Sequence, residues 1–520
     1  MTDGAAASNA KPPTTVGELM SSPVATAAPD ETVAQVAARM REQKVGSVVV
    51  VDGPKPTGIL TERDLVRIAA AGADPSAALV SEWMTANPDT AEPDETVSDV
   101  FDDLAVKGYR HVPVVKDGAL VGIVSMRDLM RLARILPVEQ LAVEAPRGLE
   151  GAIVAETELG DVRGLEGFYH YRQYDAIELA EGRTFEDVWY LLHRGHLPSK
   201  AEREAFDEEI RPLREIPEQV KALLPDIAGL GERFVALDAL TTAYSILATA
   251  LDFRPWLDVD GAELRHQALQ TCAAVPTLVM ALYRLNHGME PVDPDPDLPF
   301  VANYLSMLTG EPPQPDHARA VEQYMTSTID HGFNASTFTA RVIASTGADL
   351  GAAVLGALGA LSGPLHGGAP SRALDMIEEI GTPERTDEWL RSAVQGGRRI
   401  MGFGHRVYKT DDPRSVMLRR VARRLGGPRV EFAEHVERRA VAILEELKPG
   451  RKLYTNVEFY AGIVMEECGL PPELFTPTFA SSRVIGWTAH VLEQAADNRL
   501  IRPSARYVGP PPPEPLPDAG

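Results

Sequence analysis

Cysteine is scarce in this chain, since Cys272 and Cys468 are the only two among 520 residues. Two cysteines cannot build a disulfide framework or a cysteine metal site, which fits a reducing compartment. The first residues lack the basic region and apolar core of a secretory signal. The longest run of small apolar residues, Gly351–Gly363, is too short to span a bilayer. We therefore expect a cytoplasmic protein in which this run forms a buried helix, packed closely through glycine and alanine.

Positive charge is also in deficit, because 51 lysines and arginines stand against 75 acidic residues, a formal net charge of −24. Such a surface repels nucleic acid and anionic lipid, so we expect neither nucleic acid nor membrane as a partner. Any anionic substrate must then be held by local groups of arginine and histidine. No cluster typical of a metal site stands out. The length predicts about two to four domains, and the composition is that of a soluble globular protein.

An internal repeat lies near the N-terminus, where residues 20–69 match residues 84–133 without a gap. The segment PDETV occurs in both copies, and GILTERDLVR in the first matches GIVSMRDLMR in the second. In each copy PDETV predicts a helix start, with Asp30 or Asp94 as a candidate cap, followed by a valine-rich strand, a second strand and a final helix. The repeats are therefore mixed α and β, and we expect the two copies to pair.

This repeat resembles a pair of cystathionine-β-synthase (CBS) domains over residues 13–136, with repeats at about 16–73 and 80–136. In that family such pairs bind adenosine-containing ligands, with a hydroxyl residue facing phosphate and an aspartate holding the ribose hydroxyls. The resemblance puts these roles on four residues: Thr61, Asp64, Ser125 and Asp128. A hydroxyl and first-turn N–H groups at a helix start do favour an anion. The same residues also suit plain helix caps, so a structural or dimerising spacer is the alternative.

Two tails and a linker frame a helical body. Residues 137–148 carry two prolines and no clear period, which indicates a linker. We expect residues 1–12 and the proline-rich residues 508–520 to be disordered. Between them, residues 149–507 repeat apolar residues at three- and four-residue intervals, and strand patterns are scarce. The body should be a mainly all-α domain, and residues 233–251 and 478–500 should form its long helices.

Several short motifs in this body carry histidine, arginine or glutamate. Histidines placed in loops between glycines can face a ligand more freely than those on a helix face, because glycine lets the backbone approach closely. The motifs are IDHGFNASTFTAR with His331, SGPLHGGAP with His366, MGFGHRVYKTDDPR with His405, TNVEFYAG with Glu458, SSRVIGW with Arg483 and RLIRPSAR with Arg502.

In this order the motifs resemble those of citrate synthase, from Gly148 to Arg502, which implies large and small helical domains. The resemblance implies that Glu458 removes a proton from the α-carbon of acyl-CoA, that His366 stabilises the enolate, and that His405 polarises the ketone of oxaloacetate. The implied oxaloacetate ligands are His331, Asn334, Arg414, Arg483 and Arg502, the last reaching in from a neighbouring subunit. The implied CoA-binding residues are Gly402, Phe403, Gly404, Arg406, Lys409 and Lys452.

The implied chemistry is physically consistent. Glutamate has an ordinary pKa of about 4.3 and is a weak base, so the enolate must be stabilised as it forms. A dianionic substrate needs at least two cations, and arginine pairs carboxylates bidentately. No cofactor or metal is required beyond acetyl-CoA or propionyl-CoA as substrate, with ATP, ADP or AMP as a candidate regulator. A partner subunit's arginine implies a homodimer at minimum, with a higher oligomer left open.

Glu458 departs from the family pattern, in which the base is usually aspartate. The carboxylate is kept but lies one methylene further out. The sequence thus predicts a citrate synthase regulated by adenine nucleotide. Its alternatives are a 2-methylcitrate synthase that uses propionyl-CoA, or a catalytically weak scaffold that senses nucleotide. One methylene in a pocket is worth only about 1–3 kcal/mol, so motifs do not settle the acyl preference.

Overall fold

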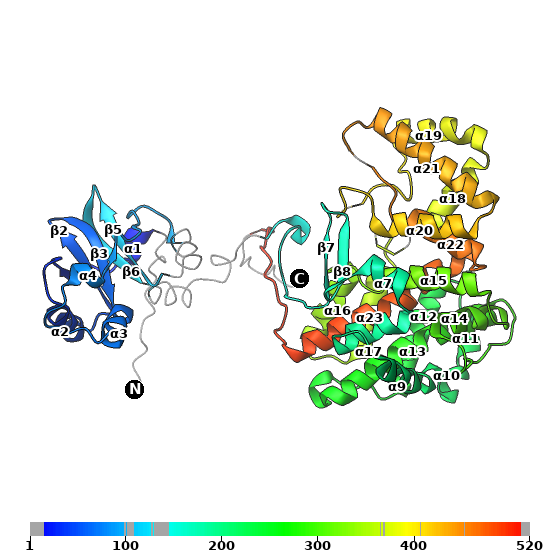
Figure 1. Ribbon diagram of the computed structural model, residues 1–520, viewed down its shortest axis with the longest axis horizontal. Helices are drawn as coiled ribbons and strands as arrows, with labels where there is room; N and C mark the ends of the chain where they lie inside the picture. The colour runs from blue at the N-terminus through cyan, green and yellow to red at the C-terminus, as the bar shows by residue number, and fades with distance from the viewer. Residues whose placement is uncertain are drawn as a thin grey trace, which may run out of the picture. The chain divides into compact units, whose positions relative to one another are not determined.

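The computed structural model describes residues 15–97, 100, 109–125, 128, 145–364, 366–367, 370–405, 407–451 and 453–510. They form two compact units (Figure 1). One holds the chain up to Ala152 together with the segment from Arg502, and the other runs from Ile153 to Ile501. The N-terminal tail and most of the predicted linker and C-terminal tail lie outside the described residues. The domain boundaries given above therefore stay predictions.

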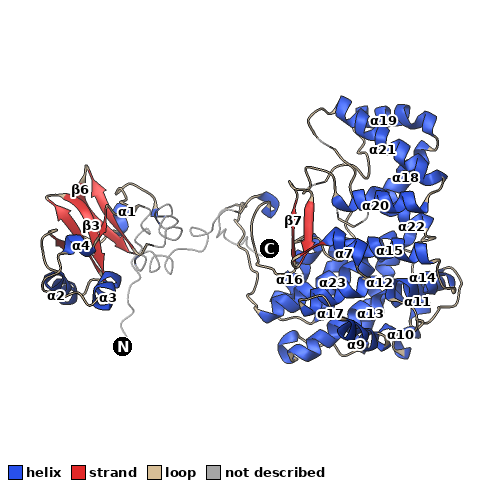
Figure 2. Ribbon diagram, viewed as in Figure 1, coloured by secondary structure: helices blue, strands red, loops and turns tan. Residues whose placement is uncertain are grey.

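The first unit mixes strands and helices, as the repeat predicts (Figure 2). One sheet has the order β1 (Thr26–Ala27), β2 (Ser47–Asp52), β3 (Lys55–Thr61) and β4 (Thr85–Ala86), and the hairpin β5 (His111–Lys116) and β6 (Ala119–Ser125) forms a second. Valines fill the centre of β2 because β-branched side chains suit a buried pleated surface. Both hairpins are antiparallel and carry a bulge at equivalent positions, after Val50 and after Val114. The two copies therefore fold alike.

The helices of this unit are α1 (Val16–Leu19), α2 (Val33–Gln43), α3 (Glu62–Ala70) and α4 (Val80–Trp83). The expected cap at Asp30 is wrong, because α2 begins two residues later and Thr32 is its N-cap. Thr32 accepts a hydrogen bond from the Gln35 N–H while the Gln35 side chain accepts from the Thr32 N–H, which satisfies two backbone donors at once. The helix predicted to open at Thr61 is confirmed, with Thr61 as N-cap.

Each repeat pairs its first segment with a strand of the other repeat. Thr85 pairs with Ile59 of the first repeat, and at the equivalent register Ser21 pairs with Ile123 of the second. Both exchanges bring a methionine onto a strand glycine: a Cβ on Gly58 would overlap the Met84 side chain, and one on Gly122 would overlap that of Met20. Each half therefore completes the other's core, which explains why the two copies occur as a pair.

The second unit is mainly helical, as predicted, and its described strands form one small sheet of β7 (Gly160–Arg163), β8 (Phe168–Tyr171) and β9 (Tyr174–Asp175) (Figure 2). Figure 1 shows α18 to α22 gathered at one end of this unit. Its helices are α7 (Ala176–Gly182), α8 (Phe185–Arg194), α9 (Lys200–Ile210), α10 (Glu218–Lys221), α11 (Leu224–Ala228), α12 (Ala236–Ala250), α13 (Gly261–Asn286), α14 (Phe300–Thr309), α15 (Pro315–Thr328), α16 (Ala335–Ser345), α17 (Leu350–Leu361), α18 (Pro370–Ile380), α19 (Thr386–Gln395), α20 (Pro413–Leu425), α21 (Pro428–Leu447), α22 (Val457–Glu467) and α23 (Phe475–Ala496).

The core of this unit is built around α13, α16, α17 and α23. The small-residue run predicted as a buried helix is α17, where a Cβ on Gly351 would lie 2.7 Å from that of Ala248. In the part of the chain that the structure describes, one helix, α13, is long and apolar enough to cross a membrane by composition, but 78% of its apolar window is buried in the protein. That burial is the mark of a central core helix.

The two long helices predicted from periodicity form, with shifted ends. The first begins at Ala236 rather than at residue 233. The second begins at Phe475 and ends at Ala496, four residues earlier than predicted. It stops because Asp497 leaves the helical conformation, with φ −138° and ψ 79°. Periodicity locates the buried face of a helix, whereas its ends depend on local backbone conformation.

Candidate active site

Two histidines predicted to bind substrate meet in the second unit although their loops are far apart in sequence. His331 lies between α15 and α16, and His405 lies in the glycine-rich loop before α20. Their ring centres are 5.8 Å apart, and Tyr408 lies beside both rings. The Tyr408 hydroxyl is 2.9 Å from His331 Nε2. Burial, together with the positive charges of Arg414 and Arg483, lowers the pKa of His331 well below its usual range. His331 is therefore neutral and suited to hydrogen bonding.

His405 is held in one tautomer by its own loop. Its Nδ1 atom accepts hydrogen bonds from the backbone N–H groups of Val407 and Tyr408, each at 3.0 Å. Burial and the charge of Arg414 lower the pKa of His405 to about 4. The single proton of the neutral ring must then lie on Nε2, because Nδ1 is already an acceptor. The ring is prepared to donate from Nε2.

Arg414 and Arg483 are both buried, at 3% and 2% exposed, but they are held differently. Arg414 forms a bidentate pair with Asp412, from Nε at 3.0 Å and from Nη2 at 2.9 Å. Asp412 also accepts the backbone N–H of Val457, at the start of the helix that carries Glu458. Arg483 donates from Nε to the Thr328 carbonyl at 2.8 Å and has no ion pair with a described carboxylate. Two buried cations in one site match the demand of a dianion.

Glu458 lies in the first turn of α22, after the N-cap Asn456, whose side chain accepts the Glu458 N–H at 3.1 Å. Burial raises the pKa of Glu458 to about 7, although the charges of Arg414 and Arg399 oppose the rise. A carboxylate with a pKa near 7 is a far better base than an exposed glutamate, because its conjugate acid holds the proton more tightly.

His366 follows α17 and hydrogen-bonds through Nε2 to Ser336 Oγ at 2.8 Å. Trp487 donates from Nε1 to the same oxygen at 3.0 Å. The hydroxyl proton of Ser336 is then left for His366 or for Asn334 Oδ1, which is 2.8 Å away. Burial and the charge of Arg483 lower the pKa of His366 to about 4, so this ring too is neutral.

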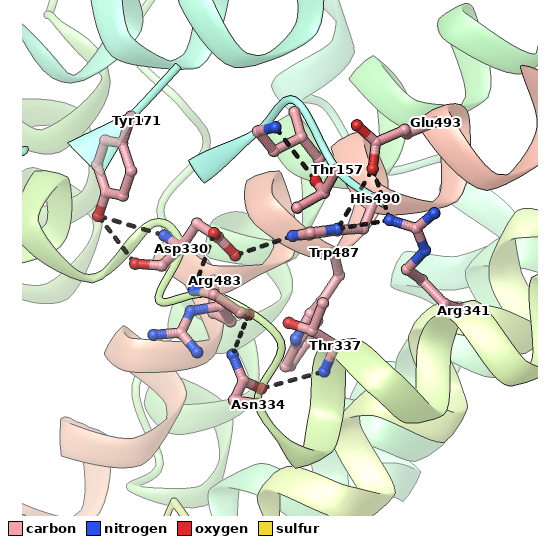
Figure 3. Close-up of polar contacts among 12 residues, drawn as sticks. Thr157, Tyr171, Asp330, Asn334, Thr337, Arg341, Arg483, Trp487, His490 and Glu493 are labelled. Atoms are coloured by element: carbon pink, nitrogen blue, oxygen red, sulfur yellow. Dashed lines mark hydrogen bonds and ion pairs between the residues drawn. The ribbon is translucent and has the colours of Figure 1, made fainter. Parts of the chain in front are cut away.

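Asn334 is occupied within its own turn. Its Oδ1 caps α16 by accepting the Thr337 N–H at 3.1 Å, and its Nδ2 donates to the Gly332 carbonyl (Figure 3). A helix cap accounts for these contacts, so its role as a substrate ligand stays a prediction. Arg502 is exposed and belongs to the other compact unit. Its predicted role also stays a prediction.

The loop predicted to bind CoA is fixed to the segment that precedes Glu458. Phe403 bridges to Thr455, the Gly404 N–H donates to the Tyr454 carbonyl at 2.7 Å, and the Asn456 N–H donates to the Gly402 carbonyl at 2.9 Å. Gly402 and Gly404 have φ values of 78° and 82°, which other residues rarely adopt. Lys409 is exposed and donates its backbone N–H to Gly164. Arg406 and Lys452 lie outside the described residues.

Sequence reasoning missed Tyr408, Asp412 and Ser336, which orient the predicted histidines and arginines. The first two belong to the GFGHRVYKTDDPR motif, so its tyrosine and its second aspartate could have been singled out. Ser336 carries no signal of its own, because its role depends on contacts with His366 and Trp487, 30 and 151 positions away. Within the described ranges, no group of three or more His, Cys, Asp or Glu side chains is placed to hold a metal ion.

The four residues predicted to bind nucleotide form two matching local pairs. The Thr61 hydroxyl and N–H both donate to Asp64 Oδ2, at 2.8 and 2.9 Å, and Ser125 does the same to Asp128, at 2.5 and 3.2 Å. In the first pair the other carboxylate oxygen lies 3.5 Å from Arg67. The Asp64 carboxylate thus completes the capping box of α3, as the alternative role as plain helix caps expects, and Asp128 makes the same contacts to Ser125.

Known protein families match both the repeat region and the helical body of the chain. The family model of the citrate synthase C-terminal domain matches residues 148–504, and that of the CBS domain matches residues 16–71 and 80–134. Citrate synthase from Haloferax volcanii is 39% identical over 369 residues, which cover 70% of this chain and 96% of that protein. Citrate synthase from Synechocystis is 38% identical over 367 residues, covering 70% and 90%. The crystal structure of citrate synthase from Thermotoga maritima aligns with a TM-score of 0.63 and 38% identity, over 71% of this chain and 98% of that one.

Proposed function

The chain belongs to the citrate synthase family, and we propose that it condenses acetyl-CoA with oxaloacetate to give citrate and CoA. Enzymes of this family are acyltransferases that need no cofactor and use acetyl-CoA as substrate. The observation that carries the proposal is one set of groups in one site: Glu458 with a pKa of about 7, neutral His366 and His405, and the buried cations Arg414 and Arg483.

In the proposed reaction, Glu458 takes a proton from the methyl carbon of acetyl-CoA while His366 donates a hydrogen bond to the thioester oxygen. The enolate carbon attacks the ketone of oxaloacetate, whose oxygen is polarised by the Nε2–H of His405. Water then cleaves the thioester of the condensed product and releases CoA. Preoriented donors are effective here because the oxygens gain negative charge as each bond forms.

The binding of oxaloacetate is assigned to His331, Arg414 and Arg483, with Asn334 and a partner's Arg502 as further proposed ligands. Arg414 keeps two donors on Asp412, so it is already oriented when substrate arrives. A contribution of Arg502 from another subunit would make the dimer the active form. We assign CoA to the Gly402–Gly404 loop with Lys409, and place the reaction in the cytoplasm, in line with two buried free cysteines.

The test is the initial rate of thiol release with oxaloacetate and either acetyl-CoA or propionyl-CoA. Turnover faster with acetyl-CoA supports citrate synthase, and turnover faster with propionyl-CoA would assign a 2-methylcitrate synthase instead. A folded protein that binds oxaloacetate but releases no thiol would contradict the proposal and favour a nucleotide-sensing scaffold. Sedimentation at assay concentration measures whether the active species is a dimer or larger.

We also propose that an adenine nucleotide binds the repeat unit and changes the synthase rate. The matching pairs Thr61 with Asp64 and Ser125 with Asp128 support this, because each sets a hydroxyl beside a carboxylate, in the first pair at the start of α3. A nucleotide can act only if its affinity differs between two states of the enzyme.

Titration with ATP, ADP and AMP tests the regulatory proposal, with Asp64→Asn plus Asp128→Asn as the variant. Asparagine keeps the shape needed for the capping contacts and removes the charge that holds a ribose diol. We expect the nucleotide concentration for half effect to rise about tenfold, as for loss of one charged hydrogen bond. The matched control is Asp30→Asn plus Asp94→Asn, two exposed aspartates at equivalent positions of the repeats. An equal response in both double variants would refute the site.

A further inference from the structure

A buried polar chain runs behind the proposed oxaloacetate ligands (Figure 3). Asp330 and His490 are each 1% exposed, and Asp330 Oδ1 lies 3.3 Å from His490 Nε2. Neither atom has a well-formed hydrogen bond to any other group in the described part of the chain. Leaving both unsatisfied would cost free energy, so each is the other's natural partner.

His490 also has polar neighbours on its far side. Arg341 places Nη1 3.4 Å from His490 Nδ1, and it also donates to Glu493 at 2.5 Å and to Gln494 at 2.9 Å. Glu493 Oε2 also lies 4.0 Å from Nδ1. An arginine can only donate, so the Arg341 contact assigns Nδ1 as acceptor and places a ring proton on Nε2. The Nε2–H group is therefore directed at the Asp330 carboxylate.

Asp330 connects His490 to the turn that carries the proposed substrate ligand His331. Its Oδ2 accepts the N–H of Gly332, and its backbone carbonyl accepts the hydroxyl of Tyr171 from β8 at 3.1 Å. His331, the proposed substrate ligand, lies between the two residues of that turn. The Asp330 carboxylate is thus held on one oxygen by the turn and on the other by α23.

The same pair also acts on Arg483. His490 and Arg483 lie on one face of α23, two turns apart. Burial lowers the pKa of Arg483, and the negative charge of Asp330 is the main opposing influence. Arg414 has Asp412 as a bidentate partner, whereas no described carboxylate forms an ion pair with Arg483 and Asp330 acts on it from further away. Asp330 therefore compensates the charge of the second arginine while leaving its terminal nitrogens available for substrate.

We propose that His490 is a positioning residue that, through Asp330, orients His331 and Arg483 for the oxo-dicarboxylate. This inference rests on the proposed function, because it assumes that these two residues bind oxaloacetate. Positioning of this kind should change the affinity for oxaloacetate. It should leave the affinity for acetyl-CoA, which we assign to the Gly402–Gly404 loop, unchanged.

Two substitutions that differ by one methylene test the proposal in the full-length protein. His490→Gln puts an amide near the place of Nε2 and can still donate to Asp330. His490→Asn reaches only the place of Nδ1, beside Arg341. We expect His490→Asn to raise the KM for oxaloacetate about tenfold, with the KM for acetyl-CoA changed less than twofold, and His490→Gln to stay within about threefold of native.

A general structural role would raise both KM values together or make both variants equally poor, and either result would overturn the proposal. If His490→Asn does not fold, Asp330→Asn compared with native gives the same split between the two KM values. If the native protein shows no turnover, the proposed function fails first. Calorimetric titration with oxaloacetate alone then decides whether the His490 contact affects binding, with equal affinity in native and His490→Asn as the contrary result.

Discussion

The polar side chains at the candidate sites of the two units differ in how far apart in sequence their hydrogen-bond partners lie. In the repeat unit, Asp64 bonds Thr61 and Asp128 bonds Ser125, each three residues away. In the helical unit, Tyr171 reaches Asp330 across 159 positions and Arg341 reaches Glu493 across 152. A local contact can form with its own helix, whereas a distant one exists only once the domain has folded. The proposed catalytic site therefore depends on the whole helical fold, while the two hydroxyl–carboxylate pairs depend mainly on their own turns.

The substitution Glu458→Gln should have the largest effect on activity and tests whether the two units act separately. Loss of a general base typically costs about 10²–10⁴-fold in rate, so we expect kcat to fall by that factor. Thermal unfolding of the repeat unit and its nucleotide binding should not change, because the substitution is confined to the site of the other unit. The measurement is steady-state kinetics together with calorimetry.

Glu467→Gln, in the last turn of the same helix α22, is the matched control and should keep kcat within about twofold, the usual range for a substitution away from the site. A Glu458→Gln enzyme with more than about a tenth of native activity would contradict the assignment of the base, since general-base catalysis contributes far more.

A smaller effect is expected from pH. With a pKa of about 7, Glu458 is protonated below that pH and cannot accept the substrate proton. The logarithm of kcat/KM should therefore rise with pH at unit slope and level off above about pH 7, as for one essential base. His366 and His405, with pKa values of about 4, stay neutral over this range and add no second limb.

This pH profile also separates the two units. The midpoint of the profile is set by Glu458 in the helical unit. Asp64→Asn plus Asp128→Asn in the repeat unit should therefore not shift it. A midpoint near the ordinary glutamate pKa of about 4.3 would contradict the effect of burial at Glu458.

The smallest expected effect is confined to the repeat unit. In Gly58→Ala and Gly122→Ala the new methyl group overlaps the methionine side chain of the exchanged segment. Because this side chain is flexible and can shift, each should cost about 1 kcal/mol of that unit's stability, the low end of the range for overpacking. Gly46→Ala, whose Cβ would make only ordinary contacts, is the control. Calorimetric scans measure the unfolding transition, and kcat measured below it should not change. Unequal losses in the two variants would show that the two copies are not equivalent in packing.

Much of the fold follows from the sequence alone. The repeat gave the mixed α and β unit, helical periodicity gave the mainly helical one, and the Gly351–Gly363 run gave the buried helix α17. Short-range capping was read less well, because Thr32 and not Asp30 begins α2. The sequence does hold the signal, because Gln35 lies three residues after Thr32 as a capping box requires, whereas Val33 lies three residues after Asp30.

The motifs already supply the chemical groups of the site: a glutamate at a helix start, histidines in glycine-rich loops, and arginines on or before helices. The protonation states and counter-charges of these groups come only with folding. Burial moved the pKa of Glu458 to about 7, two backbone N–H groups fixed the tautomer of His405, and Asp412 and Asp330 gave the two arginines different counter-charges. These states depend on desolvation and on neighbours from distant segments, and neither is encoded in the residues of a single motif.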